Sequence, residues 1–516
     1  MSLILKTTGG LWLASFLWSQ SAPGTLTLQQ ALESTLRRHP QVGIGEQQVA
    51  ASRGVLRETS GIFDQVYTSG LQQSFAPTPL TTAEQGGANP PKSAAANLTS
   101  FNAGASRLYR NGITAGPIVE MDRSRDRLFN MAGINRSRLA YQMTIPLLRN
   151  KGQEVVAAQE NSARVQVQAS QLDLNQTFTG LLTNTAVSYW ELVGAIRLLE
   201  VAISSERRGQ SLLENVSDLI QAERVPRNDI HQVRANLADR TAGRIAAEQQ
   251  NVVARQQLAL AMGLPPEGMA SPGDPAEDLP EAIVPPMNDP ETMRRYIEMA
   301  LSQRADYLAA RKRVEAEQAL LAKLKNGLRP RVDLTLSTGY SGLREGIYPQ
   351  SYLASPFYGV HGLDAIAGLR YEFAPRNNAA AGRLEQTEAS IRQAELRAAD
   401  TARSIATDVS VALAGVRNAG LRLEKASESV TAFHAALDGE REKYRLGLGS
   451  LVDILTIEDR LTTSLAVQVQ ARLDAAVQLA RLRQATGTLV DPNAGAPRAD
   501  RQAFVTLPEL RRRSQP

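Results

Sequence analysis

The chain has 516 residues, no cysteine, few aromatic residues and a formal net charge of +5. The lack of cysteine excludes disulfides, thiolate metal ligands and a cysteine nucleophile. Because basic and acidic residues alternate along the chain and the net charge is small, nucleic acid is not expected as a partner.

The first 22 residues predict a weak secretory signal peptide. Residues 11–18 form a short apolar patch that follows Lys6 and precedes the small residues Ser19 and Ser21. This order is typical of a cleaved leader. No uninterrupted apolar run in the sequence reaches the ~18 to 20 residues of a membrane helix.

Two parts of the chain repeat each other. Residues 28–65 align with residues 293–330 at a constant offset of 265. Residues 153–263 align with residues 377–487 at a constant offset of 224. Such offsets predict a tandem duplication in which the first copy carries 41 extra residues. The predicted domains are a signal peptide (1–22), a first repeat (23–263), a Pro-rich linker (264–290), a second repeat (291–490) and a flexible basic tail (491–516).

Each repeat predicts a first helix, a β-patterned segment, a long helix and a return helix. The long helix of the second repeat, residues 376–446, contains no proline and would be roughly 100 Å long at about 1.5 Å per residue. Its apolar residues recur at alternating steps of four and three, which predicts a coiled-coil seam. The seam residues are Ile405, Val409, Ala412, Val416, Ala419, Leu423, Ala426, Val430, Phe433 and Leu437.

The first repeat has a similar seam in its own long helix. It runs through Phe178, Leu182, Thr185, Tyr189, Leu192, Ile196, Leu199 and Ile203. The shorter helices are expected to stack end to end beside the long ones, so that each apolar stripe finds a partner. We predict first helices over residues 28–61 and 291–326, and return helices over residues 227–262 and 451–486.

The β-patterned segments alternate apolar and polar residues. This alternation is clear in residues 139–147, 332–340 and 363–373, whereas the segment after Phe63 alternates poorly. Strands of about ten residues with one apolar face are typical of membrane barrels. A half-buried soluble sheet shows the same pattern.

The first repeat is longer than the second between its strands. Residues 76–100 contain prolines and no periodicity, which predicts a loop in solvent. Residues 101–122 are compatible with an additional hairpin, and the sequence pattern does not decide whether they form one.

The number of strands bears on the oligomeric state. About four strands per chain cannot close a barrel, and open sheet edges are not stable in hydrocarbon. Two chains would close eight strands around a filled interior, and three would close twelve strands around a lumen. The predicted fold class is therefore an α+β membrane protein with long helical hairpins, antiparallel transmembrane barrel strands and a tandem repeat. A soluble coiled-coil scaffold is the alternative, but it leaves the strands at the same place in both repeats unexplained.

Several motifs, taken in order, resemble the TolC family of outer-membrane efflux channels. These are the opening LTLQQALESTLRRHPQV (26–42), with His39 where the family has Asn, the strand-to-helix junction YQMTIPLLRNKG (141–152) and the turn YRLGLGSLVDIL (444–455). The ends of the return helices, ALAMGLP and ARLRQATGTL, resemble the family's Leu-Ala-x-x-x-Gly close.

The resemblance implies a homotrimer with a shared twelve-stranded barrel in the lipid of the outer membrane and a twelve-helix tunnel across the periplasm. It implies passive conduction, with a periplasmic adaptor protein docked at the tip and an inner-membrane efflux or secretion pump that supplies the energy.

The turn of the second repeat has a simple local explanation. Ser450 is suited to cap the return helix, with Asp453 in its first turn. Gly447 or Gly449 is suited to end the long helix with a positive φ. This structural role competes with a functional one for both Ser450 and Asp453.

The functional interpretation of Asp453 comes from the resemblance. It implies that this residue faces the lumen, where three copies form a carboxylate ring that favours cations. The family carries a second acid three residues later, where this chain has Thr456. Glu458 and Asp459 are expected on other faces of the helix.

The turn of the first repeat departs further from the family. Pro226 is suited to the first helical position. Asp229 matches a family residue that holds the closed tip through Tyr and Arg contacts; Tyr444 is present, and Arg445 or Arg227 would replace the family's Arg. We hypothesise that contacts of Asp229 with Tyr444, together with Arg445, keep the tip closed. The candidates for adaptor docking are Pro226, Arg445, Leu446, Gly447, Gly449 and Ser450.

Catalysis is not expected. The four histidines, His39, His231, His361 and His434, are scattered, and the sequence contains no zinc-protease, phosphate-loop or serine-hydrolase motif. We therefore predict neither enzymatic activity nor a cofactor nor a metal site.

Overall fold

The computed structural model describes most of the chain. The predicted signal peptide and Gly447 lie outside the described residues. Contacts divide the chain into a turn unit (Met1–Val42, Phe178–Ala300 and Asp408–Pro516) and a sheet unit (Gly43–Thr177 and Leu301–Thr407). The described residues are 25–79, 81, 93–126, 132–223, 225–268, 272–283, 290–446, 448–490 and 500–510.

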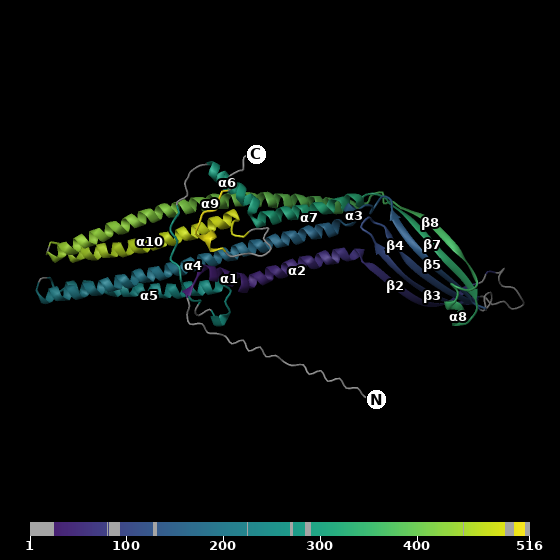
Figure 1. Cartoon of the computed structure of the whole chain (residues 1–516), viewed down its shortest axis with the longest axis horizontal. Coiled ribbons are helices and arrows are strands. Elements are labelled where there is room, and N and C mark those ends of the chain that lie inside the picture. Colours follow the sequence, from purple (N-terminus) through teal and green to yellow (C-terminus); the bar gives the residue numbers. More distant parts are fainter. Residues whose placement is uncertain are drawn as a thin grey trace, which may run out of the picture. The chain divides into compact units, whose positions relative to one another are not determined.

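The sheet unit contains one antiparallel sheet of six strands (Figure 1). The strands of this sheet follow one another in chain order. Several helices and a short strand of another sheet lie between β5 and β7 in the chain, and the short helix α8 (Pro349–Leu353) lies between β7 and β8. The strands, in their order across the sheet, are β2 (Gln65–Pro79), β3 (Ser93–Leu108), β4 (Thr114–Asp126), β5 (Ile134–Pro146), β7 (Arg331–Glu345) and β8 (Val360–Glu372).

The strands expected in residues 139–147, 332–340 and 363–373 are confirmed as parts of β5, β7 and β8. The extra residues of the first repeat form a hairpin, β3 and β4, so the sheet has two strands more than expected. The solvent loop predicted for residues 76–100 is wrong at both ends, because β2 extends to Pro79 and β3 begins at Ser93. Prolines misled the prediction: β2 is an edge strand, where a missing N–H is tolerated.

The register of the sheet gathers apolar side chains on one face. Leu363, Leu369 and Tyr371 of β8 on this face are 88%, 68% and 63% exposed, so the β8 part of the face is uncovered within one chain. The apolar face includes Tyr67, Leu71, Phe101, Val119, Leu139, Tyr141, Leu336, Leu363, Leu369 and Tyr371.

The opposite face of the sheet is polar. It includes Gln72, Asn102, Glu120, Arg138, Ser337 and Asp364. Arg138 donates to Asp364 at 2.9 Å and to Ser337 at 2.8 Å. One sheet therefore presents an apolar and a polar surface, as strands do that separate lipid from water.

Four helices in the sheet unit lie side by side. Ser52 of α2 (Pro40–Ser60) and Ser170 of α4 (Ala158–Gln221) are hydrogen-bonded at 2.8 Å. Asp173 of α4 forms an ion pair with Arg313 of α7 (Ala305–Gly327). Asn377, just before α9 (Asn378–Arg445), donates to the Gly327 carbonyl at 3.1 Å. The helix order α2, α4, α7, α9 is also the order of the strands next to them in the chain.

The two predicted first helices are each broken in two. α1 (Leu28–Arg38) is separated from α2 by His39, and α6 (Pro290–Gln303) is separated from α7 by Arg304. His39 and Arg304 have extended backbones, with ψ of 125° and 120°. At His39 the cause is Pro40, which disfavours the helical conformation of the residue before it.

The turn unit contains the parts of α4 and α9 that pack against α5 (Asp229–Ala261) and α10 (Leu451–Thr486). The coiled-coil seam predicted in α9 is confirmed: Leu423 and Phe433 are half-buried and the other eight positions are buried. In α4 the seam is buried from Phe178 to Leu192 and half-buried beyond. Among the described residues, no helix is both long and apolar enough to cross a membrane.

The linker between the repeats is tied to the turn unit. Its strand β6 (Asp274–Pro275) pairs in parallel with β1 (Thr25–Leu26). Asp278 accepts from Arg197 of α4 at 3.1 Å, and the Leu279 carbonyl accepts from Arg472 of α10 at 3.2 Å. The linker therefore contacts helices of both repeats.

Part of the predicted flexible tail is packed. Residues 501–504 form the 3-10 turn η3, and Phe504 is only 1% exposed. Arg483 of α10 donates to the Thr506 and Leu507 carbonyls at 3.0 and 2.8 Å. The prediction of a flexible tail is thus wrong for residues 500–510, and the rest of the tail lies outside the described residues.

Two glycines of the first return helix test the fold. Gly263 ends α5 with a φ of +68°, and a Cβ there would lie 2.5 Å from the His39 Cα. A residue other than glycine in the left-handed conformation costs about 1 to 2 kcal/mol. Gly263→Ala should lower the free energy of unfolding by more than this amount, because its Cβ would also clash with His39. Thermal and denaturant unfolding of the detergent-purified protein measures this change.

Gly243 provides the matched control, because it lies in the middle of α5 and a Cβ there would meet nothing within 4 Å. Gly243→Ala should raise the free energy of unfolding by about 0.5 to 1 kcal/mol. Equal effects of the two substitutions would contradict the packing of α5 against the His39 break.

Candidate functional site: the two helix turns

The second turn has the predicted cap. Ser450 precedes α10 with an extended backbone, and its hydroxyl accepts a hydrogen bond from the Asp453 N–H at 3.2 Å. Gly449 is not among the glycines of positive φ. A Cβ there would lie 3.0 Å from the Glu440 Oε1 and 3.1 Å from the Tyr444 nitrogen, a tight fit that favours glycine. The turn is therefore closed by a cap and a close backbone approach.

The first turn is built differently. Glu223 takes a positive φ of 54° just after α4. The Asp229 N–H donates to the Pro226 carbonyl at 3.2 Å, and Asn228 makes no side-chain cap bond. Asp229 is half-buried as the first residue of α5.

Tyr444 joins the two helical hairpins by packing. Its ring contacts one apolar cluster that includes Val216 and Val233 and a second cluster that includes Leu437 and Leu461. Its hydroxyl is buried and makes no hydrogen bond with any described residue. Burial, and then the negative charge of Asp229, raises the pKa of the Tyr444 phenol.

The hypothesised Asp229–Tyr444–Arg445 contact is therefore not formed as a hydrogen-bonded set. Arg445 donates to Glu442 of its own helix at 2.8 Å, and this pair raises the pKa of the Arg445 guanidinium. Because Glu442 lies three residues before Arg445, a local partner is available without any approach to Asp229.

Asp453 is exposed within one chain, as is Thr456 one helical turn later. The Thr456 hydroxyl donates to the Val452 carbonyl at 2.8 Å, so it is satisfied by its own helix. Leu446 and Leu448 are also exposed, Leu448 to 79%. The turn thus presents one acid and two apolar side chains.

The turn unit also contains a buried ion cluster that the sequence analysis missed. Glu458 of α10 is only 2% exposed and accepts from Arg208 of α4 at 3.0 Å and from Arg240 of α5 at 3.1 Å. Arg441 of α9 also donates to Glu458. One carboxylate therefore binds arginines from the three other helices.

The remaining donors of this cluster also have partners. Arg208 donates to the Thr462 hydroxyl at 3.0 Å, and Arg240 donates to the Ser205 carbonyl at 3.1 Å and to Asp459 at 3.2 Å. Burial alone raises the pKa of Glu458, but the hydrogen bonds and charges of Arg208 and Arg240 outweigh it and lower the pKa. Glu458 is thus held ionised.

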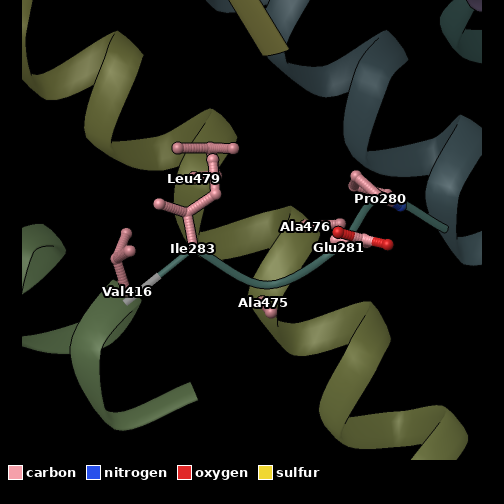
Figure 2. A pocket seen from close by; sticks show the side chains of 7 residues that line it. All are labelled: Pro280, Glu281, Ile283, Val416, Ala475, Ala476 and Leu479. Carbon is pink, nitrogen blue, oxygen red and sulfur yellow. The ribbon is translucent and has the colours of Figure 1, made fainter. Parts of the chain in front are cut away.

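A small hollow lies under the linker (Figure 2). Ile283 points toward Leu479, and Glu281 is the only ionisable group among the lining residues. Such a lining offers no converging polar groups for chemistry. Within the described part of the chain, no group of three or more His, Cys, Asp or Glu residues is arranged to hold a metal.

Substitution of Glu458 tests the ion cluster. Glu458→Gln removes the carboxylate shared by buried Arg240, half-buried Arg208 and exposed Arg441, which should cost about 3 to 5 kcal/mol. Asp459→Asn is the matched control, because the Asp459 side chain is 58% exposed and Arg240 keeps Glu458 as its partner, so a loss of only about 1 kcal/mol is expected. Thermal unfolding followed by circular dichroism compares the two variants, and an Asp459 effect as large as that of Glu458 would count against the cluster.

The same cluster predicts a dependence on pH. Because the folded pKa of Glu458 is lowered, its contribution is complete above the carboxyl's ordinary value of 4.5 and is lost as pH falls through the folded value. Unfolding temperatures between pH 7 and pH 3 should therefore fall more steeply in the wild type than in Glu458→Gln. Parallel curves would argue against an ionised Glu458.

Comparison with known proteins gives one family match. Residues 296–488 match the family described as outer membrane efflux protein. These residues cover most of the second repeat, from α6 through α10. A search of curated protein sequences found no match.

Solved structures share the fold. The outer-membrane channel OprN is 19% identical with a TM-score of 0.65, over 89% of this chain and 89% of that chain. The outer membrane protein VceC from Vibrio cholerae is 17% identical with a TM-score of 0.63, over 89% and 96%. The Campylobacter jejuni outer membrane channel CmeC is 12% identical with a TM-score of 0.64, over 96% and 95%.

These findings agree with the predicted resemblance to the TolC family and with the predicted location in the outer membrane. A soluble coiled-coil scaffold does not account for a family match of this kind or for a sheet with one apolar face. The protein is located in the outer membrane, and the match of residues 296–488 together with the shared channel fold confirms its resemblance to the TolC family of outer membrane efflux proteins.

Proposed function

We propose that the chain is one protomer of a homotrimeric channel that passively conducts exported substrates across the outer membrane. The observation that carries this proposal is the sheet, which has one apolar face and one polar face. Its edge strands, β2 and β8, pair with no further strand among the described residues. In hydrocarbon, unpaired edges must be closed by other strands. Copies of the same chain provide them.

The helices support a tunnel that continues the channel. α4 and α9 contain 64 and 68 residues, and each carries a buried seam. The resemblance to the TolC family supports an adaptor protein at the helix turns and an inner-membrane pump, for efflux or for secretion. The reaction is transport without chemistry on the cargo.

We also propose that the chain arose by duplication, with repeats over residues 23–263 and 291–490. The first contains α1, α2, β2, β5, α4 and α5, and the second contains α6, α7, β7, β8, α9 and α10, in the same order. In the six-stranded sheet, this correspondence leaves β3 and β4 as the additional strands of the first repeat.

At the turns, we propose that Asp453 lines the lumen and that the exposed side chains dock the adaptor. Asp453 is exposed and makes no ion pair with a described residue, so three copies would form an acidic ring. Arg445, Leu446 and Ser450 are exposed around it, as are Pro226 and Leu448. Asp229 and Tyr444 contribute to closure through packing and charge, without a direct hydrogen bond.

The selectivity of the pore tests the acidic ring. In planar bilayers under a KCl gradient, Asp453→Asn should move the reversal potential toward that of a non-selective pore, because it removes the ring's attraction for cations. Asp459→Asn, on the same helix and paired with Arg240, should leave the reversal potential unchanged.

Failure of the wild-type protein to form any pore, or its recovery as a soluble elongated dimer instead of a detergent-extracted membrane trimer, would refute the channel itself.

A separate experiment tests adaptor docking. The single substitutions Arg445→Cys and Ser450→Cys should each allow crosslinking to an adaptor, since the chain has no other cysteine. The control is Gln210→Cys, at an exposed position on α4. Crosslinking from this position as efficient as from the turn would argue against a specific docking site.

A further inference from the structure

We propose that the β3–β4 hairpin is part of the barrel wall, so that each chain contributes six strands and three chains close an eighteen-stranded barrel. This inference rests on the proposed trimeric channel and concerns its width. The twelve-stranded barrel implied by the family resemblance does not fit the strand count of this chain.

The hairpin is continuous with the rest of the sheet. β3 pairs with β2 from Gln65 opposite Arg107 to Pro79 opposite Ser93. β4 pairs with β5 from Thr114 opposite Thr144 to Ser124 opposite Ile134. If the hairpin were a plug or a loop, β2 and β5 would be expected to pair directly. Here they are separated by two full strands.

The turn of the hairpin is fixed between the ends of two helices. Arg110, in this turn, makes a two-pronged ion pair with Glu160 of α4 at 2.8 and 2.9 Å. Glu160 is only 5% exposed and also accepts from Ser60, the last residue of α2, at 3.3 Å. The Arg110 guanidinium lies 4.6 Å from the centre of the Phe63 ring.

This contact has the properties of a built anchor. The hydrogen bonds of Arg110 lower the pKa of Glu160 in spite of its burial. Gly112, in the same turn, has a φ of +97°, and a Cβ there would lie 2.2 Å from the Asn150 carbonyl. The Gly152 N–H, just before α3 (Gln153–Val156), donates to the Asn111 carbonyl at 3.1 Å. The turn thus fills the space between α2 and the start of α4.

The contact of Arg110 with Glu160 explains how a sheet of six strands can join a layer of four helices. α2 and α4 are in contact, whereas β2 and β5, which adjoin them in the chain, are two strands apart. The chain must diverge where the helices meet the sheet, and the β3–β4 turn occupies that position.

The widths of the two layers agree with a six-stranded wall. Four helices at about 9 Å spacing span roughly 36 Å. Six strands spaced about 4.8 Å apart and tilted by about 40° span roughly 38 Å, whereas four strands would span only roughly 25 Å. Six strands therefore continue four helices at nearly constant circumference.

The direction of the strands allows closure. The sheet is antiparallel throughout and has an even number of strands, so β2 and β8 run in opposite directions. The β8 edge of one chain therefore meets the β2 edge of the next as an antiparallel pair. Because barrel diameter grows roughly linearly with strand number, the lumen is about one and a half times as wide as that of a twelve-stranded wall.

Disulfide crosslinking counts the chains in the wall without background, because the chain has no cysteine. Ser69→Cys on β2 is combined in turn with a cysteine at Leu363, Ala365, Ala367 or Leu369 on β8. On oxidation in outer membranes, the best pair should give a ladder that ends at three covalently joined chains.

The matched control uses an internal pair of the same sheet. Tyr141 and Thr338 lie opposite each other in β5 and β7, so Tyr141→Cys with Thr338→Cys should form a disulfide within one chain and leave it monomeric in denaturing gels. A β2–β8 ladder that ends at two chains gives twelve strands and overturns the proposal, as does the absence of any link between the edges.

A second experiment measures the width of the lumen. Residues 80–133 are replaced by an Asn-Gly turn to leave four strands, with Glu160→Gln so that no carboxylate is buried without Arg110. Polyethylene glycols of graded size, added on the extracellular side of a planar bilayer, should show a cut-off radius about a third smaller than in the full chain.

An unchanged cut-off would overturn the six-stranded wall even if both proteins conduct. If the shortened protein fails to fold, the crosslinking ladder of the full chain still decides the strand number. If the full chain forms no pore but its ladder ends at three, the conducting function fails and the eighteen-stranded wall stands.

Discussion

An unpaired backbone N–H or carbonyl costs several kcal/mol in hydrocarbon, and this constraint governs the whole molecule. β2 and β8 each present a row of such groups along the open edges of the sheet. No further strand among the described residues covers them, so in the proposed channel the edges are closed by copies of the chain. The same constraint explains the division of the sheet into an apolar face and a polar face.

The turn unit is stabilised by a different kind of interaction. Glu458 binds arginines from α4, α5 and α9, so one buried carboxylate links the helical hairpins of both repeats. A buried ion cluster contributes less net stability than an apolar core of equal size, but the loss of one member is costly. Tyr444 adds apolar packing across the same hairpins, with a hydroxyl that lacks a partner among the described residues. These contacts therefore fix the α4–α5 and α9–α10 hairpins in one alignment with each other.

The features that the sequence predicted well are local or periodic. The seam from Ile405 to Leu437 and the alternating strands β5, β7 and β8 are periodic, and the Ser450 cap involves residues only three apart in the chain. The β3–β4 hairpin escaped prediction because its glycines and small residues, and the prolines that precede it, resemble a loop, and because Arg110 and Glu160 are fifty residues apart. The Glu458 cluster escaped for the same reason, since its arginines come from three separate helices.

β3 and β4 form a hairpin, so together they bring the chain back to the end of the sheet from which β3 started. This has a consequence for the evolution of such channels. Strands can be gained only in pairs, since an odd number would deliver the chain to the wrong side of the bilayer. In the proposed trimer, every inserted pair of strands changes the circumference by six strands at once. The bore of these pores is therefore expected to change in discrete steps among descendants, and a single insertion between α2 and α4 is sufficient for one step.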